Sequence, residues 1–231
     1  MKNEDPYQEL TNKILACRRC PRLVSWRESV ANTKRKAYQD EPYWGKPVPG
    51  FGDLKARVLI IGLAPGAHGS NRTGRMFTGD ASGKFLYQAL YDAGFSSSPY
   101  SSSRNDGLVL KNIFITALCR CVPPGNKPSC EEIHNCSEFL INELNALENV
   151  EGIVALGKIA FEESLKLLKN RFHYVPPEPV KFRHNEQLIV NHKIRWLISS
   201  YHPSRQNTQT GRLTPDMFRD IWDNVNALLA S

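Results

Sequence analysis

The six cysteines are the residues whose type and spacing point most directly to metal chemistry. Cys17 and Cys20 form a C-x2-C pair, a spacing at which two thiolates can bind one metal centre without backbone strain. The other four lie in the stretch CRCVPPGNKPSCEEIHNC, as Cys119, Cys121, Cys130 and Cys136. A four-ligand site that uses the pair takes two of these and leaves two as ordinary thiols. Spacing alone selects neither the two ligands nor the metal, because tetrahedral zinc and an iron–sulfur cluster both accept four thiolates.

Two loops rich in small and polar residues could bind a ligand. The first, GLAPGAHGSNRTGRMFTGDASGKFL, spans residues 62–86, and its glycines let the backbone approach a ligand closely. A helix is expected at its far end, where free N–H groups can meet an anion or a polarised carbonyl. The second, SYHPSRQNTQTGRLTP, spans residues 200–215 and carries His202. Neither loop has Rossmann or P-loop spacing, which argues against dinucleotides and nucleoside triphosphates.

The elements that position these loops follow from four short apolar runs, each succeeded by Gly, Pro or Ser. The runs predict buried parallel strands at Arg57 to Gly62, Ile113 to Leu118, Gly152 to Gly157 and Ile194 to Ser200. Helical patterns cover Ser82 to Gly94, Ser129 to Leu147 and Thr214 to Ala230. The alternation predicts an α/β, three-layer sandwich: a central parallel sheet of about four strands with helices on both faces. Loops at the carboxyl ends of its strands should converge on one site.

Length and composition set the wider limits. The 231 residues are expected to form a single domain, 1–231, in which Arg27 to Pro49 and Ser96 to Asp106 are surface excursions. No stretch approaches the roughly 20 apolar residues of a membrane span, and Met1 to Asp5 is polar and acidic, unlike a signal peptide. We therefore expect a cytoplasmic protein, in which disulfides are rare. The net charge of +7 favours an anionic partner, nucleic acid first, although a generic basic surface is the alternative.

At four motifs the sequence resembles the family-5, or B-type, uracil-DNA glycosylases, relatives of the iron–sulfur family-4 enzymes. The motifs are GLAPGAHGSNRTGRMFTGDASG, CVPPGNKP leading to Cys136, ALGKIAF and SYHPSRQNTQTGRLTP, and the resemblance runs from Cys17 to about Met217. It implies a DNA-repair enzyme that hydrolyses the N-glycosidic bond of uracil, and of other damaged bases such as hypoxanthine, in double-stranded DNA. The implied cofactor is a 4Fe-4S cluster in an N-terminal cluster-binding segment, with Cys17, Cys20, Cys121 and Cys136 as ligands.

The resemblance also implies roles for individual residues. The first loop, including Gly62, Ala64, Pro65 and Gly66, positions the base and water, and Phe77 stacks on the base. The second loop supplies His202 and enters the DNA. Many superfamily members have Asp, Asn or Glu where this chain has Leu63 and Ala64. No carboxylate can act from those two positions, so catalysis must be distributed differently.

Catalysis is expected from groups that stabilise the charge developing on the departing base. The base must first be flipped out of the duplex. His202 can then donate a hydrogen bond to a pyrimidine carbonyl, with a purely structural histidine as the alternative. Asp80 is the nearest carboxylate, and it can act on water or the sugar or simply cap the helix that follows. Asn126 can contact the base edge or serve the turn in PPGNKP.

The remaining expectations concern binding. His68 is the next histidine candidate for the substrate site, and the other four histidines are expected on the surface. DNA contacts are expected from the two loops, at Arg72, Arg75, Ser204, Arg205, Gln206 and Arg212. A monomer acting at the nucleoid is expected. The main alternatives are a non-catalytic iron–sulfur or zinc protein that binds nucleic acid, and a small-molecule hydrolase.

Overall fold

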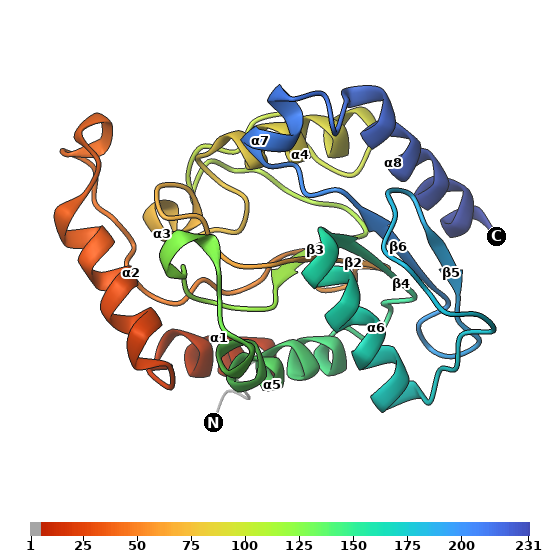
Figure 1. Ribbon diagram of the computed structural model, residues 1–231. Helices are drawn as coiled ribbons and strands as arrows, with labels where there is room; N and C mark the ends of the chain where they lie inside the picture. Colours follow the sequence, from red (N-terminus) through yellow and green to blue (C-terminus); the bar gives the residue numbers. More distant parts are fainter. Residues whose placement is uncertain (1–5) are drawn as a thin grey trace.

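The computed structural model describes residues 6–231 and contains one six-stranded sheet in the order β1-β3-β2-β4-β6-β5 (Figure 1). Its four central strands are parallel and fully buried, which confirms the strands predicted from the apolar runs. They are β2 (Val58–Gly62), β3 (Ile113–Ala117), β4 (Gly152–Leu156) and β6 (Trp196–Ser200). The segment Met1 to Asp5, interpreted above as unlike a signal peptide, lies outside the described residues.

Two antiparallel edge strands correct the prediction of a purely parallel sheet of about four strands. β1 (Phe51–Gly52) pairs with β3, and β5 (Gln187–Ile189) pairs with β6. β1 has only two residues, and β5 has three that alternate between exposed and buried. Such short edge strands lack the continuous apolar run that marks a buried strand, so the sequence pattern did not predict them.

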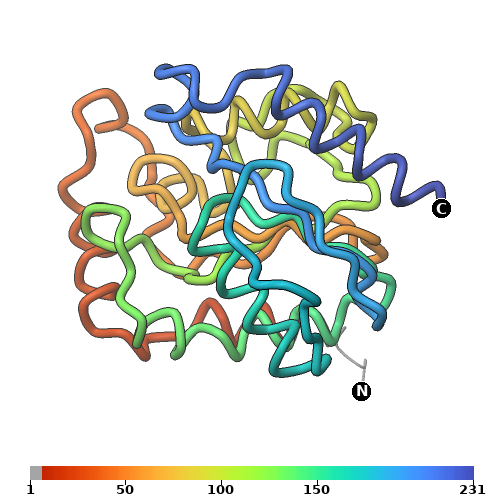
Figure 2. Tube along the Cα trace, turned by 45° about the vertical axis from the view of Figure 1, so that its right-hand side comes forward, coloured from red at the N-terminus to blue at the C-terminus, as the bar shows by residue number. Residues whose placement is uncertain are grey.

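Helices cover both faces of the sheet, as predicted (Figures 1 and 2). On one face, α4 (Ala81–Asp92) and α8 (Pro215–Ala230) pack over Val58 and Ile60 of β2. On the other, α5 (Cys130–Ala146) and α6 (Lys158–Phe172) pack over Leu59 and Ile61, and α1 (Pro6–Leu15) lies against α5. Alternate residues of one strand thus supply the two halves of the core.

A helix, α2 (Pro21–Thr33), occupies the start of the segment expected to be a surface excursion from Arg27 to Pro49. Val30 and Val48 are buried, and even Arg27 is only 2% exposed. The expectation therefore fails at Arg27, Val30 and Val48, because the chain buries an arginine that polarity alone would leave in water. Residues 31–46 are all partly buried or exposed. A single turn, η1 (Lys36–Tyr38), follows. The excursion from Ser96 to Asp106 is mostly exposed, although Ser96 and Ser101 are buried.

The remaining short elements lie in the loops after the parallel strands. α3 (Ser70–Thr73) follows β2, η2 (Pro124–Asn126) follows β3, and α7 (Arg205–Gln209) follows β6. Because the four strands are parallel, these loops leave the sheet from the same edge. Within residues 6–231, no helix combines the length and apolar character needed to cross a membrane.

Candidate active site

Phe77 and His202 meet where the loops after β2 and β6 converge. Their rings stack with centroids 5.9 Å apart and an interplanar angle of 30°. Phe77 is 9% exposed, and a Cβ added to Gly62 would lie 2.9 Å from Phe77 Cζ. Only glycine at the end of β2 therefore leaves room for this ring. The structure brings together the residue predicted to stack on the base and the residue predicted to stabilise its charge.

His202 is held as a neutral imidazole. Burial lowers the pKa of His202 to about 4. Its carbonyl accepts hydrogen bonds of 2.8 Å from the Ser204 N–H and from Asn207 Nδ2. Its Cβ would lie 3.4 Å from a Cβ added to Gly157, which has a φ of +101° and begins the loop after β4. A neutral imidazole offers one N–H donor, which suits a hydrogen bond to a carbonyl that gains negative charge.

Asp80 caps helix α4 and also borders the first loop. Its Oδ1 accepts a hydrogen bond of 2.9 Å from the Gly83 N–H, so the capping alternative is observed. Its Oδ2 would lie 2.9 Å from a Cβ added to Gly66 and 2.0 Å from one added to Gly69. Burial raises the pKa of Asp80 above its usual value. The carboxylate therefore faces the loop predicted to hold the base, and its catalytic role stays a prediction.

Around these groups, the first loop is held by its backbone. The carbonyl of Gly62 accepts from the Leu118 N–H, and that of Gly66 accepts from the Asn71 N–H, both at 3.0 Å. Leu63 packs on the core, and Pro65 is buried beside partly buried Ala64. His68, also partly buried, lies 2.9 Å from the Tyr43 hydroxyl through Nδ1. Burial, with Arg35 and Arg72 as further causes, lowers the pKa of His68.

His184 is a positioning residue that the sequence did not mark. It was expected on the surface, yet it is partly buried and its ring stacks on Tyr201 with centroids 5.1 Å apart. Nδ1 accepts from the Tyr201 N–H at 3.1 Å, and Nε2 donates to the Met217 carbonyl at 3.0 Å. His184 thus fixes the backbone next to His202. No local motif announces this role, because its partners lie 17 and 33 positions away.

Arg72 and Arg75, expected to contact DNA, are engaged within the protein. Arg72 pairs with Glu41, donates to the carbonyls of His68 and Gly79 at 2.8 and 2.9 Å, and stacks on Tyr38. The Arg75 side chain is 3% exposed. This geometry supports structural roles for both, and their contact with DNA stays a prediction.

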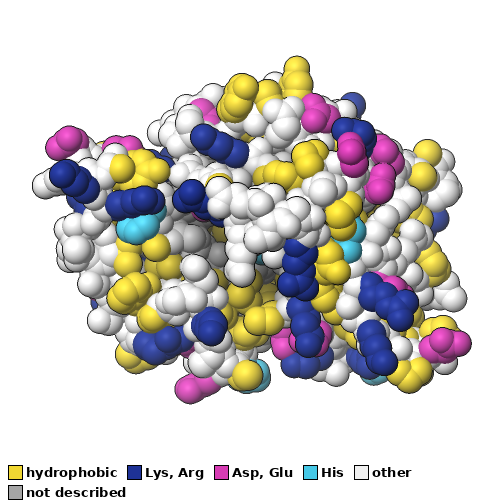
Figure 3. All heavy atoms as spheres, turned by 45° about the horizontal axis from the view of Figure 1, so that its top comes forward, with side chains coloured by type: hydrophobic (Ala, Val, Ile, Leu, Met, Phe, Trp, Pro, Cys, Tyr) yellow, Lys and Arg dark blue, Asp and Glu magenta, His cyan; other side chains and the backbone are white. Residues whose placement is uncertain are grey.

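The candidates in the second loop lie at the surface. Arg205, Gln206 and Arg212 are exposed, and the Arg212 guanidinium lies 4.8 Å from the Tyr201 ring centroid. The Ser204 hydroxyl caps α7 by accepting from the Asn207 N–H at 3.3 Å. Figure 3 shows Lys and Arg side chains spread across this side of the molecule, with acidic groups between them.

Asn126 is exposed at the tip of η2 with a φ of +58°, and its N–H donates to the Pro123 carbonyl at 3.2 Å. Asn126 therefore serves the turn in PPGNKP, which was the alternative to contact with the base edge. Contact with a base stays a prediction.

The cysteines gather where α1, α2 and α5 meet the loop after β3. Cys17 and Cys136 pack against one small apolar cluster of Leu10, Ile14 and Phe139. Cys121 is buried, and Cys20 is the N-cap of α2. Cys119, which is not among the four predicted cluster ligands, is buried. Its hydrogen bond with Cys136 lowers the pKa of the Cys136 thiol. Cys130 is exposed.

Three N–H groups approach these sulfur atoms. Arg27 Nη1 lies 3.0 Å from the Cys121 sulfur, the Arg120 backbone N–H 3.3 Å from Cys136, and Asn135 Nδ2 3.8 Å from Cys20. Among residues 6–231, however, no group of three or more His, Cys, Asp or Glu side chains is arranged to hold a metal ion. The four-ligand site therefore stays a prediction.

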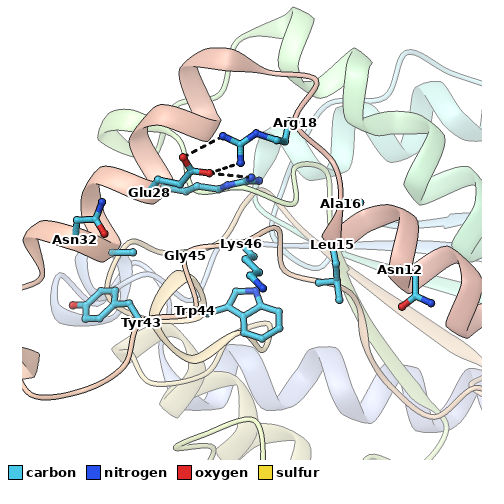
Figure 4. Close-up of a pocket in the computed structure, with 12 residues that line it drawn as sticks. Asn12, Leu15, Ala16, Arg18, Glu28, Asn32, Tyr43, Trp44, Gly45 and Lys46 are labelled. Atoms are coloured by element: carbon cyan, nitrogen blue, oxygen red, sulfur yellow. Dashed lines mark hydrogen bonds and ion pairs between the residues drawn. The ribbon is translucent and has the colours of Figure 1, made fainter.

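A cavity of about 750 Å³ lies beside the cysteine region, between α1, α2 and residues 43–46 (Figure 4). An ion pair between Arg18 and Glu28 lies on one side of the cavity, and Tyr43, Trp44 and Lys46 line the other side. Its lining includes none of the residues predicted to act on the substrate. We therefore place the candidate active site at Phe77 and His202 and not in this cavity.

Comparison with known proteins identifies the family. The profile of the uracil DNA glycosylase superfamily matches residues 49–226. A type-5 uracil-DNA glycosylase of Thermus thermophilus is 53% identical over 208 residues, which cover 90% of this chain and 91% of that protein. The chain belongs to the type-5 uracil-DNA glycosylases.

Other type-5 uracil-DNA glycosylases agree with this assignment. The one from Mycobacterium tuberculosis is 49% identical over 221 residues, covering 95% of this chain and 81% of that protein. A type-4 uracil-DNA glycosylase of Pyrobaculum aerophilum is more distant, with 32% identity over 165 residues that cover 71% of this chain and 67% of that protein. The superfamily match includes the loops that carry Phe77 and His202.

Proposed function

We propose that this protein excises uracil from double-stranded DNA by hydrolysing the N-glycosidic bond. The observation that carries the proposal is the contact between Phe77 and a neutral His202 at the carboxyl ends of the parallel strands. The type-5 relatives are uracil-DNA glycosylases, which supports the same substrate. A flipped uracil would stack on Phe77, and the backbone of Gly62, Ala64, Pro65 and Gly66 would border it.

Each polar group then has a proposed task. His202 donates its N–H to the uracil carbonyl that gains negative charge as the bond to the sugar breaks. Asp80 orients the attacking water or stabilises the cationic sugar, because the chain has apolar side chains at Leu63 and Ala64. Asn126 contacts the edge of the base, and His68 lines the substrate site as part of the first loop. Arg205 and Arg212, with Ser204 and Gln206, bind DNA phosphates from the surface loop after β6.

A single-turnover assay on a duplex with one uracil tests this function. Abasic sites should form with the wild-type protein, and a matched duplex with thymine should stay intact. A protein that binds DNA without cutting would identify the alternative, a non-catalytic nucleic-acid-binding protein. Hypoxanthine in the same duplex tests the broader substrate range that the resemblance implies.

We also propose that Cys17, Cys20, Cys121 and Cys136 hold a 4Fe-4S cluster. The donor chemistry fits this group, because four thiols come from neighbouring elements and three N–H groups approach their sulfur atoms. When bound, the cluster would supply a covalent link between the α1–α2 segment and α5. No step of base excision needs it. We further propose that the protein acts as a monomer on chromosomal DNA.

A further inference from the structure

Phe77 has an unusual backbone conformation for a bulky residue. Its φ is +50°, in the left-handed region that favours glycine, and Gly79 follows with a φ of +84°. Bulky residues rarely adopt this region, and such strain persists only where surrounding contacts impose it. The Phe77 carbonyl is also tightly packed, since a Cβ added to Gly83 would lie 1.8 Å from its oxygen. Something must hold this turn in place.

A buried polar network lies beside the turn. The guanidinium of Arg75 donates to both carboxylate oxygens of Asp106, at 2.8 and 2.5 Å. It also donates to the hydroxyls of Thr78 and Ser101, at 3.0 and 2.7 Å. Those two hydroxyls lie 2.6 Å apart. The network therefore joins the residues on both sides of Phe77 to the segment 101–106.

The backbone on each side of Phe77 is held as well. Before it, the Met76 carbonyl accepts from the buried Tyr87 hydroxyl at 3.0 Å. After it, the Gly79 N–H donates to the Ser101 carbonyl at 3.3 Å. Asp106 is itself fixed, because its carboxylate accepts from the N–H groups of Ser102 and Leu108 at 2.9 and 3.1 Å. The segment expected to be a surface excursion thus braces the turn.

We propose that Arg75, Thr78, Ser101 and Asp106 form a latch that holds Phe77 in its left-handed conformation, with its ring against His202. The four are positioning residues for base excision and act through Phe77. The proposal rests on the role proposed above for Phe77 as the platform for the flipped base. It gives Arg75 a task other than contact with phosphate.

A double-mutant cycle tests whether the latch acts through Phe77. Thr78→Val removes the buried hydroxyl and keeps the side chain's shape, so the single-turnover rate on uracil DNA should fall about tenfold or more. Affinity for undamaged duplex should not change. In a Phe77→Ala background the same substitution should cost less than about twofold, because the ring it positions is gone. An equal loss in both backgrounds would overturn the proposal.

Hydrogen exchange supplies a readout that does not depend on activity. Thr78→Val and Ser101→Ala should each speed exchange in residues 75–80 and leave α6 unchanged. Two variants are used so that one can report if the other folds poorly. The matched control is Glu151→Gln, which breaks ion pairs with Arg57 and Arg195 at the opposite, amino ends of the strands. It should lower stability without changing exchange in residues 75–80 or the rate.

The experiments distinguish a failure of the platform role of Phe77 from a failure of the latch. If Phe77→Ala alone keeps the wild-type rate, the platform role of Phe77 is wrong, and the exchange data still decide on the latch. Faster exchange in residues 75–80 then supports it, and unchanged exchange in both latch variants overturns it.

Discussion

The protonation state of His202 determines what this residue can do in base excision. A pKa of about 4 leaves the imidazole neutral at physiological pH, with a single N–H to donate. Stacking on Phe77 orients the His202 ring, and the two hydrogen bonds to the His202 carbonyl hold its backbone before any DNA binds. A preorganised donor in a site with little water stabilises developing charge more strongly than the same group in solution.

His202→Ala should therefore slow single-turnover cleavage of uracil DNA by about a hundredfold or more, in the range found for losing one preorganised donor. Affinity for the duplex should barely change, because the exposed arginines proposed to contact phosphate are untouched. Rapid-quench kinetics and a binding titration measure the two effects separately. A near-normal rate would remove His202 from the catalytic machinery.

The depressed pKa of His202 also predicts a pH dependence of stability. Between about pH 6.5 and pH 4, the His202 imidazole of the folded protein stays neutral, because its pKa is lowered from 6.5 to about 4. In the unfolded chain the same imidazole takes up a proton in this pH range. Stability from this group is thus present above about pH 6.5 and is lost as pH falls toward 4, by at most about 1.4 kcal/mol per pH unit. Urea unfolding of wild type and His202→Gln at pH 7 and pH 5 should show a smaller loss in the variant.

Asp80→Asn separates capping from catalysis. Asn caps a helix about as well as Asp, so the free energy of unfolding should change by less than about 1 kcal/mol. If the carboxylate acts on water or on the sugar, the cleavage rate should nevertheless fall by at least about tenfold. Unfolding and single-turnover assays on one preparation give both numbers. An unchanged rate would leave Asp80 with the cap alone.

At the scale of elements, the interior of the sheet was predictable and its edges were not. A parallel strand buried on both faces is apolar along most of its length, so β2, β3, β4 and β6 are visible in the sequence. Edge strands lack that constraint. The loops were predictable as the place of the site, because parallel strands end at one edge, but their internal contacts were not.

Two of the buried arginines, Arg72 and Arg75, illustrate this limit. Arg72 reaches Glu41 and Arg75 reaches Asp106, each across 31 positions of the chain. No local pattern encodes pairings at such separation, so both residues could only be read as exposed basic side chains. Conversely, the capping box formed by Ser129 and Glu132 is local, and it stands at the start of the helix predicted from Ser129 to Leu147.

The proposed cluster makes a prediction at the same scale, because it would join the α1–α2 segment to α5. Purified protein should carry about four irons per chain and absorb broadly in the visible range. Cys136→Ala should lose the iron and lower the melting temperature. Cys130→Ala, which changes an exposed cysteine, is the matched control and should retain both. One zinc per chain in protein prepared without air would contradict the assignment.

At the scale of the whole molecule, the excess of basic over acidic side chains gives a net charge of +7. Several arginines are already neutralised by partners, as Arg18 is by Glu28 and Arg120 by Glu143. Each ion pair removes one cation and one carboxylate, so pairing leaves the net charge at +7 and decides only which cations are free to meet phosphate. Arg205 and Arg212, at the end of the sheet that carries His202, remain without an acidic partner among the ion pairs of residues 6–231.

This distinction can be measured from the salt dependence of DNA binding. Each phosphate contact releases counterions, so Arg205→Ala and Arg212→Ala should each lower the slope of log K against log salt by about one unit. Arg75→Ala should leave the slope unchanged, because its guanidinium is buried against Asp106. Arg171→Ala, an exposed arginine near the end of α6, is the matched control for loss of charge alone. If the slope falls for Arg171 as much as for Arg205 and Arg212, binding depends on net charge, and the loop after β6 is no special contact surface.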